Sequence, residues 1–217
     1  MQIWQLREYA FLEYQEALSL QTKILEKRNR KECKNTVLLL EHPPVFTLGN
    51  RGGKEFLQLP EEKIVEKGIS IISTRRGGYI TYHAPGQLVI YLIVSLQEMK
   101  KGIATYIRQL EEVMIQIGEY FQVPTQRHPE RPGAWIKNKK IGSVGVSVSK
   151  GITMHGLAFN VNLDLNPFSW ISPCGFIDVE MTSLEKYKKE AVSMKDVRAV
   201  SKQIIANIFN ISWENGI

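Results

Sequence analysis

The order in which two kinds of apolar pattern follow one another is the feature that most limits what this chain can fold into. In some segments apolar side chains recur every three or four residues, which predicts helices, and in others they form short alternating or continuous runs, which predicts strands. The predicted helices span residues 11–30, 60–67, 103–121 and about 193–209. The predicted strands span residues 36–40, 69–73, 79–83, 87–94, 133–137, 139–148 and 153–163. Because strands come in runs instead of alternating strictly with helices, we predict an α+β fold, a mixed β-sheet with helices packed on one face.

Prolines and a helix cap indicate where several of these elements end. Glu41-His-Pro-Pro44 must leave regular structure, because its two prolines remove backbone donors and restrict their neighbours. The segment Asn166–Gly175 also contains two prolines and is expected to be irregular. Ser193-Met-Lys-Asp196 resembles a capping box and predicts the start of the last helix.

Length and composition bound the class of protein. With 217 residues, 43% of them hydrophobic, the chain can form one sizeable core, so we expect a single domain over residues 1–217. No apolar run reaches the roughly 18 residues that a membrane span needs. The N-terminal residues lack a basic start followed by a long apolar stretch, so no secretory signal is visible. Cys33 and Cys174 do not make a disulfide framework, and we expect a cytoplasmic protein.

The basic charge of the chain indicates acidic partners. A net charge of +6 and an isoelectric point of about 9.2 favour association with nucleic acid or with an acidic carrier protein. The densest basic run, residues 27–31, follows a predicted helix. We interpret this run as a solvated helix end, because cations there complement the helix dipole.

Lys140 and Cys174 would form a reactive pair if the fold brings them together. A thiol is a weak nucleophile until it loses its proton, and a nearby ammonium lowers the pKa of a thiol. Cys174 lies between Pro173 and Gly175, in a tight peptide whose backbone amides could serve an oxyanion. Each residue also has an interpretation without a catalytic role: Cys174 could be buried as a small hydrophobic side chain, and Lys140 could be a solvated residue at the start of a strand. Since Lys139 and Lys140 point to opposite faces of a strand, at most one of them can face a site.

The segment Arg76–Gln87 is the most unusual run, with glycines and a proline around a four-residue strand. Tyr79, Thr81 and His83 share one face of that strand, and the flanking glycines would let an extended substrate lie along the backbone. Neither the phosphate-loop pattern nor the dinucleotide-binding glycine pattern is present. A single Arg-Gly-Gly string is weak evidence for RNA binding. A hairpin without a function is the alternative.

Glycines and histidines make further segments candidates for a functional site. Gly142 and Gly145 interrupt a β-branched strand, which usually means close approach of a ligand or of another backbone. His155 directly precedes Gly156 inside a predicted strand, and His42 neighbours two prolines. No His-x-x-x-His or Cys-x-x-Cys spacing occurs, so we expect no zinc site.

Taken together, these segments resemble the lipoyl(octanoyl) transferases, the octanoyl-carrier-protein:protein transferases of lipoate synthesis. The resemblance covers nearly the full length. The motifs that carry it follow in the family's order: Glu41–Gly49, Arg76–Gln87, Pro132–Trp135, Lys140-Ile141, His155–Asn160 and Pro173–Gly175. The chain departs from the family at Ala84, where glycine is usual, so the loop there is expected to differ slightly.

The resemblance implies a fold, a reaction and partners. The fold is that of the biotin and lipoate protein ligases. Cys174 would be the nucleophile that takes an octanoyl (or lipoyl) group from acyl carrier protein, and Lys140 its acid–base partner. A lysine on a lipoyl domain of a 2-oxoacid dehydrogenase complex, or on the glycine cleavage H protein, would then take the group as an amide. No cofactor, metal, nucleic acid or membrane is implied. The implied substrate-binding residues are Arg76, Gly77, Gly78, Tyr79, Thr81, His83, Gly142, Ser143, Val144, Gly145, His155, Gly156 and Ala158.

Three other functions compete with this one. An ATP-dependent lipoate protein ligase of the same fold would activate a free acid and would not need Cys174. A basic, non-enzymatic RNA- or carrier-binding module would bind with a steep salt dependence. A thiol hydrolase would pass the acyl group from Cys174 to water.

Overall fold

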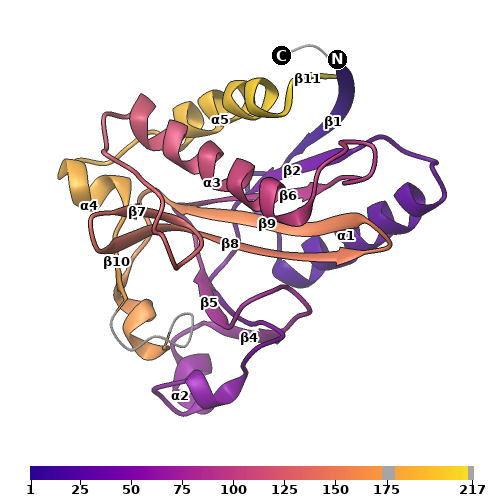
Figure 1. Cartoon of the computed structure of the whole chain (residues 1–217). Coiled ribbons are helices and arrows are strands. Elements are labelled where there is room, and N and C mark those ends of the chain that lie inside the picture. Colours follow the sequence, from indigo (N-terminus) through magenta and orange to yellow (C-terminus); the bar gives the residue numbers. More distant parts are fainter. Residues whose placement is uncertain (173–178, 215–217) are drawn as a thin grey trace.

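The computed structural model describes residues 1–172 and 179–214, which form a large sheet, a small sheet and the helices around them (Figure 1). The large sheet is mixed, as predicted: β1 pairs parallel with β2, whereas β6, β9 and β8 are antiparallel neighbours. Within the described residues the sheet has eight strands, with β7 (Ala134–Ile136) paired to β8 at one end. The other strands follow in the order β10 (Glu180–Met181), β8 (Lys139–Ser149), β9 (Ile152–Asn160), β6 (Gln87–Ile93), β2 (Thr36–Leu40), β1 (Gln2–Glu8) and β11 (Ile211–Trp213).

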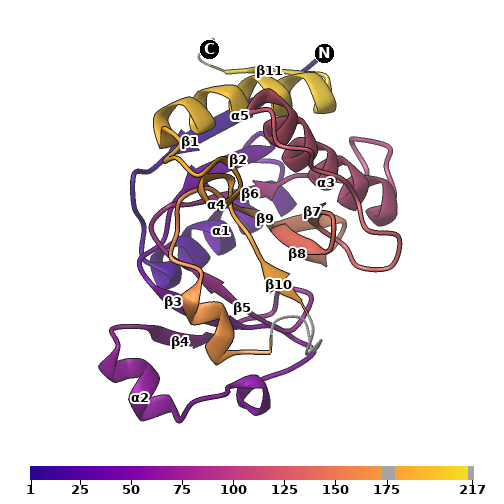
Figure 2. The same cartoon turned by 90° about the vertical axis from the view of Figure 1, so that its left-hand side faces the viewer.

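Helices cover both faces of the large sheet, which corrects the prediction of helices on one face. α3 (Ile103–Tyr120) and α5 (Met194–Phe209) share a core with one face, and α1 (Tyr14–Asn29) packs on β9 and β6 from the other (Figures 1 and 2). The reason is visible in β6, where Leu88, Ile90 and Leu92 enter the α3/α5 core. The alternate residues Val89, Tyr91 and Ile93 enter the α1 core. A strand that is apolar on both faces needs a layer on each side.

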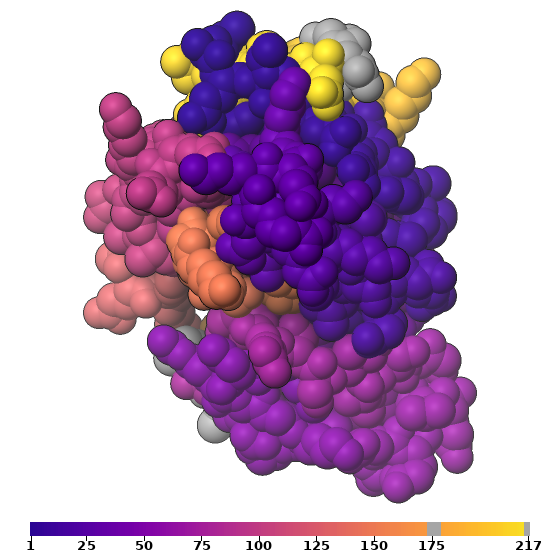
Figure 3. All heavy atoms as spheres, turned by 90° about the vertical axis from the view of Figure 1, so that its right-hand side faces the viewer, coloured from indigo at the N-terminus to yellow at the C-terminus, as the bar shows by residue number. Residues whose placement is uncertain are grey.

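A small sheet projects from the α1 side of the large one. Its order is β4 (Ser70–Ser73), β3 (Val45–Leu48), β5 (Ile80–His83), and α2 (Glu61–Glu66) contacts β4. In the space-filling view this part forms a lobe below the rest of the molecule (Figure 3). The remaining elements are the 3₁₀ helices η1 (Lys54–Phe56) and η2 (Asn166–Trp170) and the short α4 (Leu184–Lys188). No helix in the described ranges is both long and apolar enough to cross a bilayer.

The predicted elements agree with the observed ones to within three residues at each end. The predicted cap is present, since the backbone N–H of Asp196 donates to the Ser193 hydroxyl at 3.3 Å. The predictions missed β1, β3, α4, β10, β11 and both 3₁₀ helices, and η2 forms the first part of the segment 166–175 that was expected to be irregular. Strands of two or three residues such as β10 and β11 are too short for a periodicity to show, and β3 follows directly on the two prolines.

Candidate active site

A cavity of about 60 Å³ lies between the loop before β5, β5 itself, β8 and β9. Most residues predicted for the site line this inner cavity: Arg76, Gly77, Gly78, Tyr79, Thr81, His83, Lys140, Ser143, Val144, Gly145, His155, Gly156 and Ala158. Gly142 is not among its lining residues. A Cβ there would lie 2.4 Å from the Met114 sulfur, so Gly142 permits the close packing of α3 on β8. Cys174 lies outside the described residues.

Sequence reasoning missed several lining residues. Tyr14 from the start of α1, Ile80, Tyr91 from β6 and Leu157 also line the inner cavity. Tyr14 lies in the helix predicted over 11–30, and Tyr91 lies in the strand predicted over 87–94. The available signal was a phenol within each element, because a buried hydroxyl needs a partner.

The glycine-rich loop is fastened to both sheets. Arg76 is buried, and its guanidinium donates to the Thr47 hydroxyl at 2.9 and 3.0 Å and to the Thr47 carbonyl at 2.6 Å. The Gly77 N–H donates to the Val146 carbonyl of β8 at 2.9 Å. A Cβ on Gly77 would lie 2.8 Å from that carbonyl, so the close approach requires glycine. The loop therefore forms a fixed wall with a buried cation in it.

Lys140 and Lys139 lie in opposite environments, as predicted. Lys139 is exposed and pairs with Glu180 at 2.7 Å. Lys140 is only 5% exposed, and its Nζ lies 5.4 Å from the centre of the Trp135 ring. The register between β7 and β8 shifts next to Lys140, so Ile141 is an extra residue there. Such a bulge re-aims neighbouring side chains, here turning Lys140 towards the cavity.

A hydrogen bond to one backbone carbonyl determines which ring nitrogen of His42 carries the proton. Nδ1 lies 2.6 Å from the Leu12 carbonyl, so it must be the donor. Nε2 then accepts from the Tyr91 hydroxyl at 2.8 Å. Tyr91 thus has its donor engaged and presents only an acceptor to the cavity.

A similar chain orients His83. The Asn160 amide donates to the Thr182 carbonyl at 2.9 Å and accepts from the Gln87 amide at 2.9 Å. The Gln87 oxygen therefore faces His83 Nδ1 at 2.7 Å, which makes Nδ1 the donor and Nε2 an acceptor. Thr182 in turn donates its N–H to the Lys140 carbonyl, so the chain links His83 to the strand of Lys140.

Burial keeps these histidines neutral. Desolvation lowers the pKa of His42 to about 4 and, together with the charge of Arg76, that of His155 to about 4. Burial and the neighbouring His42 lower the pKa of His83 well below its ordinary value. At neutral pH all three rings are therefore uncharged hydrogen-bonding groups and weak bases.

An outer groove of about 470 Å³ continues from the inner cavity. The two share Gly77, Gly78, Tyr79, Lys140, Val144 and Gly145. Ile103 and Ile107 of α3, with Val146 and Val148 of β8, give the groove apolar walls. An aliphatic chain can therefore be buried with one end beside Lys140.

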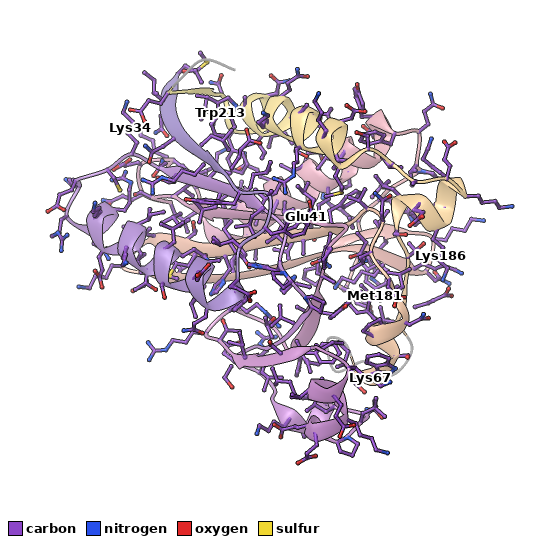
Figure 4. The ribbon with its side chains drawn as sticks, turned by 180° about the vertical axis from the view of Figure 1, so that it is seen from behind. Lys34, Glu41, Lys67, Met181, Lys186 and Trp213 are labelled. Carbon is purple, nitrogen blue, oxygen red and sulfur yellow. The ribbon has the colours of Figure 1, made fainter. Side chains whose placement is uncertain are left out.

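The turn at Ala84 shows no strain. Ala84 is not among the residues with positive φ, and the turn's left-handed position is taken by Gly86 at φ +85°. Gln87 donates its N–H to the Ala84 carbonyl at 3.1 Å, as in a type II turn. Glu41, labelled in Figure 4, accepts from the Gly86 N–H at 2.8 Å and pairs with Arg198 at 3.1 Å. The family glycine is thus not required at this position.

The geometry suits acyl transfer. It combines a buried lysine, a fixed arginine, neutral hydrogen-bonding rings and an adjoining apolar groove. Cations close to a reacting carbonyl stabilise the negative charge that develops on its oxygen. An apolar groove next to these groups would hold the aliphatic part of an acyl substrate.

The fold is that of ligases which attach lipoate or biotin. The structure of a bi-partite lipoate protein ligase from Thermoplasma acidophilum matches with a TM-score of 0.79 at 17% identity, over 99% of this chain and 86% of that one. A biotin protein ligase from Aquifex aeolicus matches with a TM-score of 0.57 at 13% identity, over 96% and 70%. The predicted fold class is confirmed.

Sequence similarity is more specific than the fold. Residues 13–206 match the family described as the lipoyl protein ligase A/B catalytic domain. An octanoyltransferase from Desulfotalea psychrophila is 44% identical over 174 residues, covering 79% of this chain and 78% of that protein. One from Bacteroides fragilis is 36% identical over 214 residues, covering 94% and 97%. The chain therefore belongs to the lipoyl protein ligase A/B family and, within it, to the octanoyltransferases, as its motifs predicted.

Proposed function

We propose that this chain transfers an octanoyl (or lipoyl) group from acyl carrier protein to a lysine of a lipoyl domain, through a thioester on Cys174. The observation that carries the proposal is Lys140, buried beside a cavity whose histidines are neutral, in a chain whose relatives are named octanoyltransferase.

The proposed reaction has two transfers. The Cys174 thiolate attacks the thioester carbonyl, and the phosphopantetheine thiolate leaves with a proton from Lys140. The amine of the acceptor lysine then attacks the Cys174 thioester, an amide forms, and the Cys174 thiolate is released while Lys140 takes the amine proton. Thioester exchange is nearly balanced and amide formation is downhill, so the sequence of steps needs no ATP. We give Lys140 the proton-transfer role from its place in the family's motif and its position at the cavity, while burial lowers the pKa of the histidines and makes them weaker bases.

Both substrates match features of the chain. The apolar groove beside Lys140 would take the acyl tail, whose roughly seven methylenes contribute about 5–6 kcal/mol when buried. The net charge of +6 suits an acidic carrier protein as donor. For the acceptor, the Thermoplasma ligase structure is described together with its E2 lipoyl domain. We extend this to lipoyl domains of 2-oxoacid dehydrogenase complexes and to the glycine cleavage H protein.

Intact-protein mass spectrometry tests the covalent route. Wild type and Cys174→Ser are mixed with octanoyl-acyl carrier protein without ATP. We expect one octanoyl adduct on the wild type, absent from Cys174→Ser and discharged by an added lipoyl domain. An adduct that survives in Cys174→Ser, or one that only water discharges, would contradict the proposal.

The alternative is an ATP-dependent ligase, because a lipoate-protein ligase A bound with ATP has the same fold, with a TM-score of 0.78. A parallel reaction with ATP and free octanoate, without carrier protein, distinguishes the two. Modification of the lipoyl domain in this reaction alone would assign the chain to the ligases.

A further inference from the structure

His155 interrupts the regular alternation of side chains along β9. Leu157 and Phe159, two and four residues further on, enter the core beneath α3 and α5. Val146, the partner of His155 on β8, packs against that same core. Alternation and pairing therefore predict the His155 ring on the α3/α5 face of the sheet.

The ring instead lies on the α1 face. It contacts Tyr91 at 6.0 Å between ring centres, and Tyr91 belongs to the core beneath α1. His155 has φ +61°, a left-handed conformation that side chains other than glycine rarely adopt within a strand. This backbone rotation explains why the ring lies on the opposite face from Leu157, where it lines the inner cavity.

The rotation also takes the backbone N–H of His155 out of the sheet. That N–H donates to the side-chain oxygen of Gln21 on α1, at 2.8 Å and 134 positions away in sequence. Gln21 has no exposed surface and lies between Ala17 and Ile24 in the buried stripe of α1. A backbone N–H can only donate, so the amide must present its oxygen. Without this acceptor the N–H would be buried and unpaired, which is unfavourable.

The His155 imidazole is buried and lines the inner cavity. Within the described part of the chain, His155 Nδ1 is buried and has no hydrogen-bond partner. Tyr14 also lines the cavity, and burial raises the pKa of its hydroxyl, an effect that the neighbouring Thr74 and Thr47 side chains partly offset. Buried polar atoms are normally satisfied, so an unpartnered one on a residue that lines a cavity is a candidate for contact with a bound molecule.

We propose that Gln21 is a positioning residue of the acyl-transfer site: its side-chain oxygen holds the His155 backbone in the left-handed conformation that turns the imidazole into the inner cavity. The inference rests on the proposed function for its activity readout. Gln21 itself does not touch the substrate.

Three variants test this role. Gln21→Met keeps the side-chain length and removes the acceptor, whereas Gln21→Glu keeps an acceptor oxygen. Gln109→Met is the matched control, because Gln109 of α3 also bonds a backbone group, the Ile208 carbonyl at 3.0 Å, but lies outside the cavity lining. The measurements are kcat and KM with octanoyl-acyl carrier protein and a lipoyl domain, together with urea unfolding.

We expect Gln21→Met to lower kcat/KM by about tenfold or more, since displaced site groups cost rate steeply. Gln21→Glu should restore most of the activity, and Gln109→Met should retain it. Wild-type activity in Gln21→Met, or equal losses in Gln21→Met and Gln21→Glu, would overturn the proposal.

A measurement on the wild type covers the case in which Gln21→Met does not fold. The three-bond coupling between the amide and α protons of His155 should have the value of a left-handed residue, and the amide should exchange slowly. An extended-strand coupling would overturn the proposal. If the wild type fails to transfer octanoyl groups, the proposed function fails, while this coupling still tests the left-handed conformation of His155 on which the role of Gln21 rests.

Discussion

The two faces of the large sheet have different compositions and different tasks. Beneath α3 and α5 the interior is a continuous apolar core that includes Leu110, Met114 and Phe159. Beneath α1 an apolar patch around Ile24 gives way to buried polar groups that surround the inner cavity, Tyr91 among them. The first face stabilises the fold by burying apolar surface, and the second gives most of its buried polar groups hydrogen-bond partners while leaving a few among the described residues, such as His155 Nδ1, unpaired.

The comparison shows how a small enzyme can carry a polar site inside its core. Backbone groups orient two polar side chains on the α1 face: His42 by the Leu12 carbonyl, and Gln87 by the Tyr82 carbonyl at 3.2 Å. These two in turn orient Tyr91 and His83 through side-chain hydrogen bonds. Substitutions on the two faces should therefore separate activity from stability.

The largest expected effect is on catalysis at the α1 side. Lys140→Ala should lower kcat/KM by about 10²–10⁴-fold, the usual range for loss of an acid–base group, with little change in folding. Steady-state transfer from octanoyl-acyl carrier protein measures it. Lys139→Ala is the control, because its exposed pair with Glu180 contributes less than about 1 kcal/mol. Near-normal turnover in Lys140→Ala would contradict the proposal that Lys140 is the acid–base residue.

Substitutions in the core beneath α3 and α5 should lower stability and leave catalysis nearly unchanged. Leu110 is fully buried in the α3/α5 core, and Leu110→Ala should lower the free energy of unfolding by about 2–5 kcal/mol. Its kcat should stay close to that of wild type at temperatures where the protein is folded.

Tyr91→Phe is the counterpart on the α1 face. It removes the hydroxyl that donates a hydrogen bond to His42 Nε2, and it should reduce activity while lowering the free energy of unfolding by only about 1 kcal/mol. A loss of kcat in Leu110→Ala comparable to that in Lys140→Ala would break the comparison.

The polar face should also make stability depend on pH. The pKa values of His42 and His155 are lowered to about 4 by burial, whereas in the unfolded chain they are near the ordinary 6.5. Below pH 6.5 the unfolded state binds more protons, so stability is full above this pH and falls as pH drops towards 4. Each histidine should account for about 3 kcal/mol over that window. Urea unfolding at pH 7.5, 6 and 5 measures it, and equal stability at all three would contradict buried neutral histidines.

The smallest effect concerns the support of Lys140. Gly133 has φ +130°, and a Cβ there would lie 2.4 Å from the Gly142 carbonyl oxygen and 2.8 Å from Lys140 Cε. Gly68→Ala is the matched control, with φ +76° and no atom within 4 Å of the added Cβ. Backbone strain should cost each variant about 1–3 kcal/mol. Only Gly133→Ala should also lower kcat/KM, by about tenfold, because it displaces the lysine. Equal activity in the two variants would show that this crowding does not matter.

Much of the site could be predicted because its residues lie in local motifs. Glycines around Tyr79, the opposite orientation of Lys139 and Lys140, and the His155-Gly156 pair are all properties of neighbours in sequence. Gly142 belonged to the same kind of motif, yet its glycine serves the packing of α3 on β8. A motif marks a position as special without saying which surface imposes the requirement.

The sequence by itself determined the longer helices, most of the strands, the family and the candidate site segments, because periodicity and motif spacing depend on residues close together in the chain. Only the tertiary structure decided that α1 covers the second face and that Tyr14 and Tyr91 reach the cavity. It also decided that His155 turns against the alternation of its strand. The reason is that the acceptor for its backbone N–H is Gln21, 134 positions away, and no local pattern records such a contact.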